Sequence, residues 1–323
     1  MNSLSYQDLH HKFAADIDAE TAGALERLGA TSSGTKNAVV GLLRHQQLKH
    51  PLSVLPLLVH GAETGSPEPA VPIAAVHVLW WTSACYFDDL SDGNGSTPVG
   101  DELGPHEALL ASVVAGHVLP LQILRALQAP EEVRGALTTE ALTCGAVAAE
   151  GQLADIRGDL SGATRKSVAE VYRGKSGAPF GMITAMAAIL AEAPPEQIGL
   201  WREFGHVFGI LWQLFNDQED ILSGRNEDLL NGTVTYLLAC ALEEGAPGTA
   251  ERLTDLHAAA RESARARNAL TELLLAPANQ HRYQRDLTAF REEAHRLLAD
   301  LGGDEAYVTA LRQLVDHSSR LYL

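Results

Sequence analysis

The sequence has 323 residues, of which 46% are hydrophobic and 20% are charged, and this balance excludes a generally disordered chain. Its formal net charge of -17, from 41 acidic and 24 basic residues, argues against sequence-independent binding to nucleic acid or anionic lipid. An anionic substrate would therefore need a local source of positive charge, and metal ions held by carboxylates are the obvious one.

The cysteines and the N-terminal segment exclude further classes of protein. Cys85, Cys144 and Cys240 are odd in number and widely spaced, with no CxxC motif, so neither a disulfide framework nor a structural zinc site is expected. Residues 1–20 contain no apolar run that could act as a signal sequence. No window approaches about 18 uninterrupted apolar residues. We therefore expect a cytoplasmic protein with no membrane-spanning segment and no nucleic-acid partner.

Apolar residues recur at spacings of three and four through most of the chain, and the alternation typical of strands is rare. This pattern predicts an all-α protein, a single domain over residues 1–323. We expect a bundle of about ten to twelve helices around a central apolar cavity. In chain order, the expected helices cover residues 5–29, 37–46, 52–63, 69–92, 105–128, 131–157, 163–193, 196–222, 228–244, 248–276, 281–301 and 304–320.

The helix expected over residues 69–92 is almost wholly apolar from Val76 to Phe87 and then ends in the acidic motif Asp88-Asp89-Leu90-Ser91-Asp92. On a helix, Asp88 and Asp92 share a face, whereas Asp89 lies about 100° round. Three carboxylates at a helix C-terminus repel one another and the macrodipole, at a cost of roughly 1 to 2 kcal/mol. Hard cations such as Mg²⁺ would relieve this repulsion.

The helix expected over residues 196–222 repeats this design, because apolar residues 207–215 run directly into Asn216-Asp217-Gln218-Glu219-Asp220. An isolated acidic pentapeptide is more often a solvated helix end, but two copies that each follow a buried helix favour a shared metal site. If the two helices flank one cavity, cations at its mouth would bind a ligand with a long hydrocarbon and a polyphosphate head.

The two motifs and further blocks in the same order make the sequence resemble the trans-isoprenyl diphosphate synthase (polyprenyl synthetase) family. The first motif matches the family's DDxxD, and the second matches it less strictly. Trp212-Gln213 stands where the family has Phe-Gln. The other blocks are Gly151 to Asp155, which resembles GQxxD, Lys175 to Phe180, which resembles KTgaLf, and Asp228 to Thr235, which resembles GxDlxxGKxT.

This resemblance implies an all-helical fold, usually dimeric, with a prenyl diphosphate substrate and three Mg²⁺ ions. It also implies roles for single residues. The catalytic residues would be Asp88, Asp89, Asp92, Asp217 and Lys175. The metal ligands would be Asp88, Asp89, Asp92, Asn216, Asp217 and Asp220. The diphosphate would be bound by Lys175, Gln213 and Arg225, the last of which lies just beyond the second motif.

The departures from the family concern mainly the site of its second substrate, isopentenyl diphosphate. Gln47 and Leu48 stand where a basic block has Lys and Arg, and Trp81 occupies the position of a diphosphate-binding His. The loop 93–104 contains no Arg, although the family has a pair there. Each lost charge-assisted contact is worth about 1.5 to 3 kcal/mol. On the allylic side, Thr233 replaces the Lys of GKxT.

In the family, the residues four and five positions before the first Asp form the floor of the chain pocket, and here these are the small residues Ala84 and Ser83. Trp80, one turn further down, would close the pocket, which suits a C15 or C20 prenyl chain. Aromatic faces stabilise cations by roughly 0.5 to 2 kcal/mol each, although core packing is the commoner role of any single ring. The expected pocket residues are Trp80, Trp81, Ser83, Ala84, Phe87, Gln152, Trp212 and Phe215.

Three functions follow from these features. The first is a class I terpene synthase, in which metal-triggered departure of diphosphate is followed by cyclisation or deprotonation. The second is a prenyltransferase with an acceptor other than isopentenyl diphosphate. The third is a chain-elongating farnesyl or geranylgeranyl diphosphate synthase in which Arg44, Lys49 and His50 replace the missing cations. The altered second diphosphate site places the terpene synthase first.

Overall fold

The computed structural model describes residues 4–45, 52–91, 103–244 and 248–323. Within these ranges the chain forms α-helices α1 to α16 with short 3-10 and π turns, and no strand. The predicted all-α fold is therefore confirmed. The chain divides into two compact units. Unit 1 consists of Met1–Cys144, Gly181–Glu203 and Leu298–Leu314, and unit 2 of Gly145–Phe180, Phe204–Leu297 and Val315–Leu323. A single domain over residues 1–323 stays a prediction.

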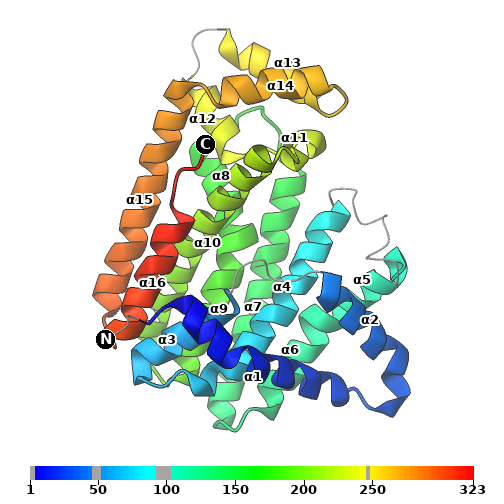
Figure 1. The fold of residues 1–323 in the computed structure, drawn as a ribbon, viewed down its shortest axis with the longest axis vertical. Helices are drawn as coiled ribbons and strands as arrows, with labels where there is room; N and C mark the ends of the chain where they lie inside the picture. The colour runs from blue at the N-terminus through cyan, green and yellow to red at the C-terminus, as the bar shows by residue number, and fades with distance from the viewer. Residues whose placement is uncertain (1–3, 46–51, 92–102, 245–247) are drawn as a thin grey trace. The chain divides into compact units, whose positions relative to one another are not determined.

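Unit 1 is built around α4 (Val71–Ser91), the helix that carries the first acidic motif. Most of its residues from Ile73 to Ser83 are buried. Its most extensive helix contacts are with α1 (Tyr6–Glu26), α5 (Pro105–Val113) and α6 (Leu119–Ala126) (Figure 1). The other elements of this part of the chain are η1 (Ala30–Ser32), α2 (Ser33–His45), η2 (Leu52–Val54), α3 (Leu55–Thr64) and η3 (Glu68–Ala70).

Unit 2 contains a group of shorter helices from the second half of the sequence. These are α8 (Arg165–Tyr172), α11 (Glu227–Asn231), α12 (Tyr236–Glu244), α13 (Thr249–Ala260) and α14 (Ala264–Leu274). Helices α13 and α14 lie side by side, and α12 packs against α8 and α14 (Figure 1). The longer helices contribute residues to both units: α7 (Glu131–Ile156), α9 (Ala178–Leu190), α10 (Pro195–Ser223), α15 (Pro277–Leu301) and α16 (Glu305–Ser318).

The expected helices agree with the observed ones to within a few residues, apart from interruptions that local periodicity does not indicate. Gly232 adopts a left-handed conformation, with φ 76°, and separates α11 from α12. The Ser263 hydroxyl accepts from the Ala266 amide and so begins α14 as a new helix after α13. The other interruptions are the π turns η5 (Val114–Val118) and η6 (Arg173–Gly177).

Among the described residues, Glu68–Ser91 and Pro105–Ala126 are long and apolar enough to cross a membrane by length and composition. In these stretches 56% and 50% of the apolar window, respectively, is buried inside the protein. The core helix of a globular domain has the same composition, so both stretches are weak evidence for a membrane segment.

Candidate active site

The first acidic motif lies at the C-terminal end of α4 in unit 1. Asp88 and Asp89 are half-buried there, and the hydroxyl of Ser91 donates to the backbone carbonyl of Asp88 at 2.8 Å. Asp92 lies outside the described residues, so its place beside Asp88 stays a prediction. The altered basic positions Gln47 and Leu48, the possible substitutes Lys49 and His50, and the loop up to residue 102 lie outside them too.

The predicted pocket residues of α4 differ in their surroundings. Ser83 is buried and packs directly on Gly116 of the π turn η5, because a Cβ added to Gly116 would lie 2.4 Å from the Ser83 Oγ. The lack of a side chain at Gly116 is therefore needed for the close approach of η5 to Ser83 on α4, and the part of Ser83 in a chain pocket stays a prediction. The half-buried members of this set are Trp80, Trp81, Ala84 and Phe87.

Trp81 packs edge-on against the buried ring of His77, with the ring centroids 6.0 Å apart. Burial lowers the pKa of His77 to about 4, so this ring is neutral at physiological pH. The resemblance implies a basic His ring at position 81. Here that position carries the large apolar ring of Trp81, which packs against the neutral ring of His77. Nearer the motif, the buried Tyr86 donates to the backbone carbonyl of Pro105 at 2.9 Å.

The second acidic motif lies within α10 in unit 2, and both oxygens of Asp217 accept hydrogen bonds. Tyr172 Oη donates to Asp217 Oδ2 at 2.5 Å, and Gln213 Nε2 donates to Asp217 Oδ1 at 3.0 Å. Asp217 is 4% exposed, and this burial raises its pKa to about 7, while the two hydrogen bonds act in the opposite direction. Burial and the nearby Asp217 raise the pKa of Tyr172, so its hydroxyl keeps the proton that it donates.

The π turn η6 supplies two further residues of this site. Lys175 Nζ pairs with Asp155 Oδ2 at 2.7 Å, and Ser176 Oγ donates to Gln213 Oε1 at 2.7 Å. A π turn inserts one residue into a helix and so redirects the side chains around it, and such turns occur frequently at functional sites. Here it sends two neighbouring residues to different helices, Lys175 to α7 and Ser176 to α10.

Close backbone contacts hold η6 against these helices. A Cβ added to Gly151 would lie 2.3 Å from the Lys175 nitrogen, and one added to Gly209 would lie 2.5 Å from the Ser176 carbonyl oxygen. Backbone atoms cannot move aside as a flexible side chain can, so only glycine allows both contacts. The positions of Lys175 and Ser176 therefore depend on two glycines on other helices.

Asp220, the last residue of the second motif, holds the start of α11. Its Oδ1 accepts from the Glu227 amide at 2.9 Å, and its Oδ2 accepts from the Asp228 amide at 3.3 Å. Asn226 adopts a left-handed conformation, with φ 52°, which turns the chain back towards Asp220 and which Asn tolerates better than most residues. Arg225 Nε lies 3.9 Å from Asp220 Oδ1. The predicted roles of Asp220 at metal and Arg225 at diphosphate stay predictions.

The carboxylates of unit 2 act on one another electrostatically. Burial, and then repulsion from Asp217 and Asp220, raises the pKa of Asp228, whereas Lys175 acts in the opposite direction. A divalent cation would relieve this repulsion, and carboxylate oxygens are ligands that Mg²⁺ prefers. Within the part of the chain that the structure describes, no three His, Cys, Asp or Glu side chains are placed to hold a metal ion. The residues fit a cation bound by one or two carboxylates together with substrate oxygens and water.

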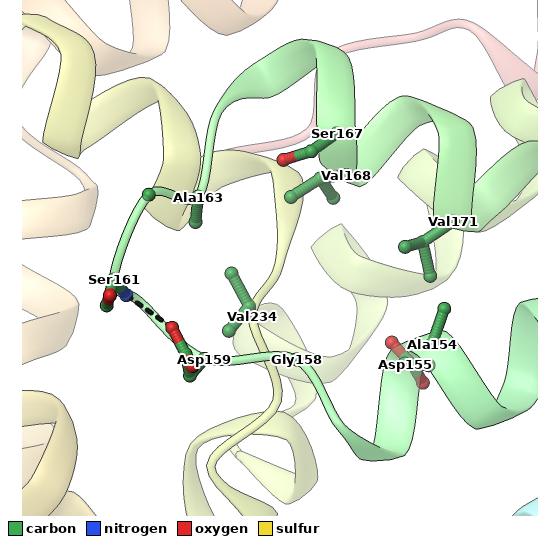
Figure 2. Close-up of a pocket in the computed structure, with 11 residues that line it drawn as sticks. Ala154, Asp155, Gly158, Asp159, Ser161, Ala163, Ser167, Val168, Val171 and Val234 are labelled. Carbon is green, nitrogen blue, oxygen red and sulfur yellow. Dashed lines mark hydrogen bonds between the residues drawn. The ribbon is translucent and has the colours of Figure 1, made fainter.

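A pocket of about 240 Å³ lies beside Asp155, between the loop 158–163 and α8 (Figure 2). The Ser161 amide donates to Asp159 Oδ1 at 2.7 Å and so fixes the loop, while Val234 lines the pocket from a third segment. Small-molecule sites usually have volumes of roughly 300 to 1,000 Å³, so this pocket alone is too small for a prenyl diphosphate. It lies next to the Lys175–Asp155 pair and is lined mainly by small and apolar residues.

The predicted pocket residues of α10, Trp212 and Phe215, stack on each other in unit 2 with ring centroids 5.4 Å apart. Phe215 also contacts Tyr322 edge-on at 5.7 Å. Gln218, inside the second motif, accepts from the Tyr322 amide at 2.8 Å and donates to the Arg320 carbonyl at 3.2 Å. The residues near 320 therefore support the motif, a contact that no sequence pattern indicates.

Unit 2 thus brings together three residues predicted from the sequence, Lys175, Gln213 and Asp217, in one hydrogen-bonded neighbourhood. The predicted residues Asn216 on α10 and Gln152 on α7 are half-buried. Tyr172 and Ser176 were not among the predicted site residues, although Ser176 lies in the Lys175–Phe180 block and Tyr172 lies three residues before Lys175. The first motif belongs to unit 1, and the expectation that the two motifs face each other stays a prediction.

The sequence matches a family model and a curated relative over part of its length. The family model described as "Polyprenyl synthetase" matches residues 101–274, more than half of the chain, which include the second motif and begin after the first. A curated relative from Methanothermobacter thermautotrophicus, named "Short chain isoprenyl diphosphate synthase", is 26% identical over 217 residues. The match covers 62% of this chain and 65% of the relative, which is less than two thirds of that protein.

Solved structures resemble the whole chain. Geranylgeranyl pyrophosphate synthetase from Pyrococcus horikoshii has a TM-score of 0.79 at 17% identity, over 98% of this chain and 99% of that one. Geranylgeranyl pyrophosphate synthase from Corynebacterium glutamicum, complexed with isoprenyl diphosphate and magnesium, has a TM-score of 0.78 at 19% identity, over 96% and 98% of the two chains. Identities this low establish the shared fold alone. With the family match, they lead to one conclusion: the chain belongs to the polyprenyl synthetase family.

Proposed function

We propose that the protein is a magnesium-dependent prenyltransferase of the chain-elongating kind, a prenyl diphosphate synthase. In this reaction the C–O bond of an allylic diphosphate breaks, and diphosphate leaves with the bonding electrons. The double bond of the acceptor, isopentenyl diphosphate, forms the new C–C bond, and a proton then leaves the neighbouring carbon. The product is an allylic diphosphate that is longer by five carbons.

The observation that carries this proposal is the network around Asp217. A buried carboxylate is costly unless hydrogen bonds or counterions compensate for the lost water, and here two neutral donors, Tyr172 and Gln213, fix it beside the Lys175–Asp155 pair. In such a site the carboxylate oxygens of Asp217 can bind a cation. The ammonium group of Lys175, which lies near them, can bind an anion. A diphosphate with its metal ions matches this combination of charges.

The names of the relatives support chain elongation over cyclisation. The curated relative is named as an isoprenyl diphosphate synthase, and the Corynebacterium glutamicum structure was solved with isoprenyl diphosphate and magnesium. The chain-elongating synthase, an alternative in the prediction from sequence, is therefore the first candidate. The terpene synthase, which that prediction placed first, is the second.

Divalent cations would be held by Asp217, with Asp220, Asn216 and the first motif as further candidates, and would neutralise charge on the departing diphosphate. The residues of the chain would do the rest. Lys175 would donate to a diphosphate oxygen, with Asp155 holding its ammonium in place. Tyr172 and Gln213 would keep Asp217 oriented, and Ser176 would hold Gln213.

One observation favours the second candidate, a terpene synthase that uses a single substrate. Trp81 places a large apolar ring on α4 seven residues before Asp88, against the neutral His77. A second diphosphate would need positive charge at this position, whereas an apolar ring suits a hydrocarbon or a carbocation. The two candidates therefore differ in the group that would bind beside Trp81, which is a second diphosphate in the synthase and a hydrocarbon chain or carbocation in the terpene synthase.

The deciding experiment incubates the protein and Mg²⁺ with geranyl, farnesyl or geranylgeranyl diphosphate, each with and without isopentenyl diphosphate. Extension by five carbons only when isopentenyl diphosphate is present supports the proposal. Hydrocarbon or alcohol from a single substrate would replace it with the terpene synthase. Consumption of the allylic diphosphate only with another added acceptor, such as an aromatic ring or a second prenyl chain, would point to the prenyltransferase with a non-standard acceptor.

Trp81→His tests the acceptor side directly. If the apolar ring limits binding of isopentenyl diphosphate, the variant should lower the KM for that substrate and leave the KM for the allylic substrate unchanged. Trp80→His, one position away on the same helix, is the matched control and should not lower either value. An unchanged KM for isopentenyl diphosphate in Trp81→His would show that this ring does not set acceptor binding.

We also propose a homodimer, which the family resemblance implies, and a cytoplasmic location. Leu110 and Val113 on α5 are exposed, at 69% and 44%, and three residues apart on one face of the helix. Sedimentation at the mass of one chain at micromolar concentration would contradict the dimer.

A further inference from the structure

The hydroxyl of Tyr172 joins two elements of unit 2 in a way that the family resemblance does not indicate. Its oxygen accepts from the Tyr236 amide at 3.0 Å, and its single proton is then available to Asp217 Oδ2 at 2.5 Å. The latter distance is that of a short charge-assisted O–H···O⁻ hydrogen bond. Tyr172 is 2% exposed, so water does not compete for either contact.

The fold explains why this side chain reaches Asp217. Tyr172 is the last residue of α8, immediately before the π turn η6, and Tyr236 is the first residue of α12. The first amides of a helix have no partner within it, so the Tyr172 hydroxyl satisfies one of these donors while it contacts the motif on α10. One hydroxyl therefore links α8, α10 and α12.

The arrangement also constrains the plane of the Asp217 carboxylate. Tyr172 binds one oxygen and Gln213 binds the other, and Gln213 is held in turn by Ser176. A carboxylate held at both oxygens cannot rotate about its last bond without breaking a buried hydrogen bond. The remaining lone pairs then have fixed directions, which is the condition for binding a cation with strict geometry such as Mg²⁺.

We infer that Tyr172 is a positioning residue, which holds Asp217 in the orientation that binds a divalent cation; this inference rests on the proposed function. Tyr172 does not touch substrate or metal itself. It acts through the carboxylate, as groups that hydrogen-bond to metal ligands do in other metal sites.

The test compares Tyr172→Phe with Tyr283→Phe. Each change removes one buried hydroxyl next to α10 and keeps the ring, but Tyr283 donates to the backbone carbonyl of Leu214, at 2.7 Å, instead of to a carboxylate. If Tyr172 served only to pack the core and to cap α12, both variants would lower the melting temperature and neither would change metal binding. Mn²⁺ binding, measured by electron paramagnetic resonance with and without inorganic diphosphate, separates the two roles.

We expect Tyr172→Phe to weaken Mn²⁺ binding by about 10- to 100-fold. Tyr283→Phe should bind Mn²⁺ as the parent does. Turnover of Tyr172→Phe should recover as Mg²⁺ is raised, because the loss lies in metal affinity. In an Asp217→Asn background the Tyr172→Phe change should have no further effect on Mn²⁺ binding, because the two residues act as one unit.

Equal Mn²⁺ affinity in the parent and a folded Tyr172→Phe variant would overturn the inference and leave the proposed function intact. If the parent binds Mn²⁺ and diphosphate, loses this binding in Tyr172→Phe, but extends no allylic substrate, the inference stands and the proposed function fails. If the parent binds no Mn²⁺ with diphosphate, both fail.

Ser176→Ala gives a second variant, should the loss of the α12 contact unfold Tyr172→Phe. It leaves Tyr172 in place and releases Gln213, the donor to the other Asp217 oxygen. Weaker Mn²⁺ binding in this variant would support orientation of Asp217 by its donors, and unchanged binding would count against it.

Discussion

The two acidic motifs both follow an apolar stretch of helix, but their carboxylates differ in burial. Asp217 is 4% exposed inside unit 2, and each of its oxygens accepts from a side chain on the protein. Asp88 and Asp89 are half-buried at the end of α4 in unit 1. Both oxygens of the buried Asp217 are therefore held by side chains of unit 2, whereas Asp88 and Asp89 keep part of their surface exposed.

This difference has consequences for binding. A buried carboxylate loses its hydration, and hydrogen bonds restore only part of that loss, so a cation gains more by binding at Asp217 than at a hydrated carboxylate. A half-buried carboxylate keeps part of its hydration and so gains less from a bound cation. We therefore expect metal affinity in the free protein to depend mainly on the second motif.

The largest expected effect comes from neutralising one carboxylate in each motif. Asp88→Asn and Asp217→Asn should each lower turnover by at least about 100-fold, because each removes a predicted metal ligand. In the absence of substrate, only Asp217→Asn should clearly weaken Mn²⁺ binding. Steady-state kinetics and Mn²⁺ titration measure the two effects. Asp16→Asn, at an exposed carboxylate on α1, is the control and should change neither. Equal loss of Mn²⁺ affinity in both motif variants would contradict the comparison.

The second effect concerns stability and pH in protein treated with a chelator. The pKa of Asp217 is raised to about 7, above the 3.8 of an ordinary Asp, so the folded state binds more protons between these values. Stability should therefore fall as pH rises from about 4 to 7 and then level off, with a loss on the order of 4 kcal/mol. Asp217→Asn should lose this part of the pH dependence.

Melting temperatures from pH 4 to 8 test this prediction. The parent and Asp217→Asn curves should separate as pH rises, with the variant more stable at pH 8. Addition of Mg²⁺ and inorganic diphosphate should narrow the difference, because bound cations favour the ionised carboxylate. Parallel curves for the two proteins would contradict the prediction.

A third prediction tests whether close helix packing supports the second motif. Gly209→Ala places a Cβ 2.5 Å from the Ser176 carbonyl oxygen and should lower the free energy of unfolding by about 1 to 3 kcal/mol. Gly199, ten residues earlier on α10, has no atom within 4 Å of an added Cβ. Gly199→Ala should therefore raise stability by about 0.5 to 1 kcal/mol. Urea unfolding measures both, and equal effects would show that the contact at Gly209 relaxes.

The smallest effect is expected beside the first motif. Tyr86 donates to a backbone carbonyl, so Tyr86→Phe should cost only about 1 kcal/mol of stability and leave Mn²⁺ binding unchanged. This contrasts with Tyr172→Phe, where the same chemical change removes a contact to a carboxylate. A loss of Mn²⁺ affinity in Tyr86→Phe, seen by the same titration, would show that the first motif is also oriented by a tyrosine.

Local sequence signals predicted much of this molecule. The spacing of apolar residues located most helices to within a few residues, because the 3.6-residue period is a property of each segment alone. The same signals missed the breaks at Gly232 and Ser263 and both π turns. A single Gly or Ser is tolerated within a helical pattern, and only packing decides whether the helix continues through it. The role of Tyr172 was missed for a similar reason, since a tyrosine in an amphipathic helix is ordinarily a core residue.

The sequence by itself determined the all-α class and the place of the two acidic motifs along the chain, and it predicted Lys175 and Gln213 as site residues and Trp81 as an altered position. These depend on residue types at short spacing or on the order of blocks along the chain. The tertiary structure decided what holds the second motif. The Tyr172–Asp217 hydrogen bond joins residues 45 positions apart, and the contacts at Gly151 and Gly209 join separate helices. Such contacts form only when helices pack, so no local pattern records them.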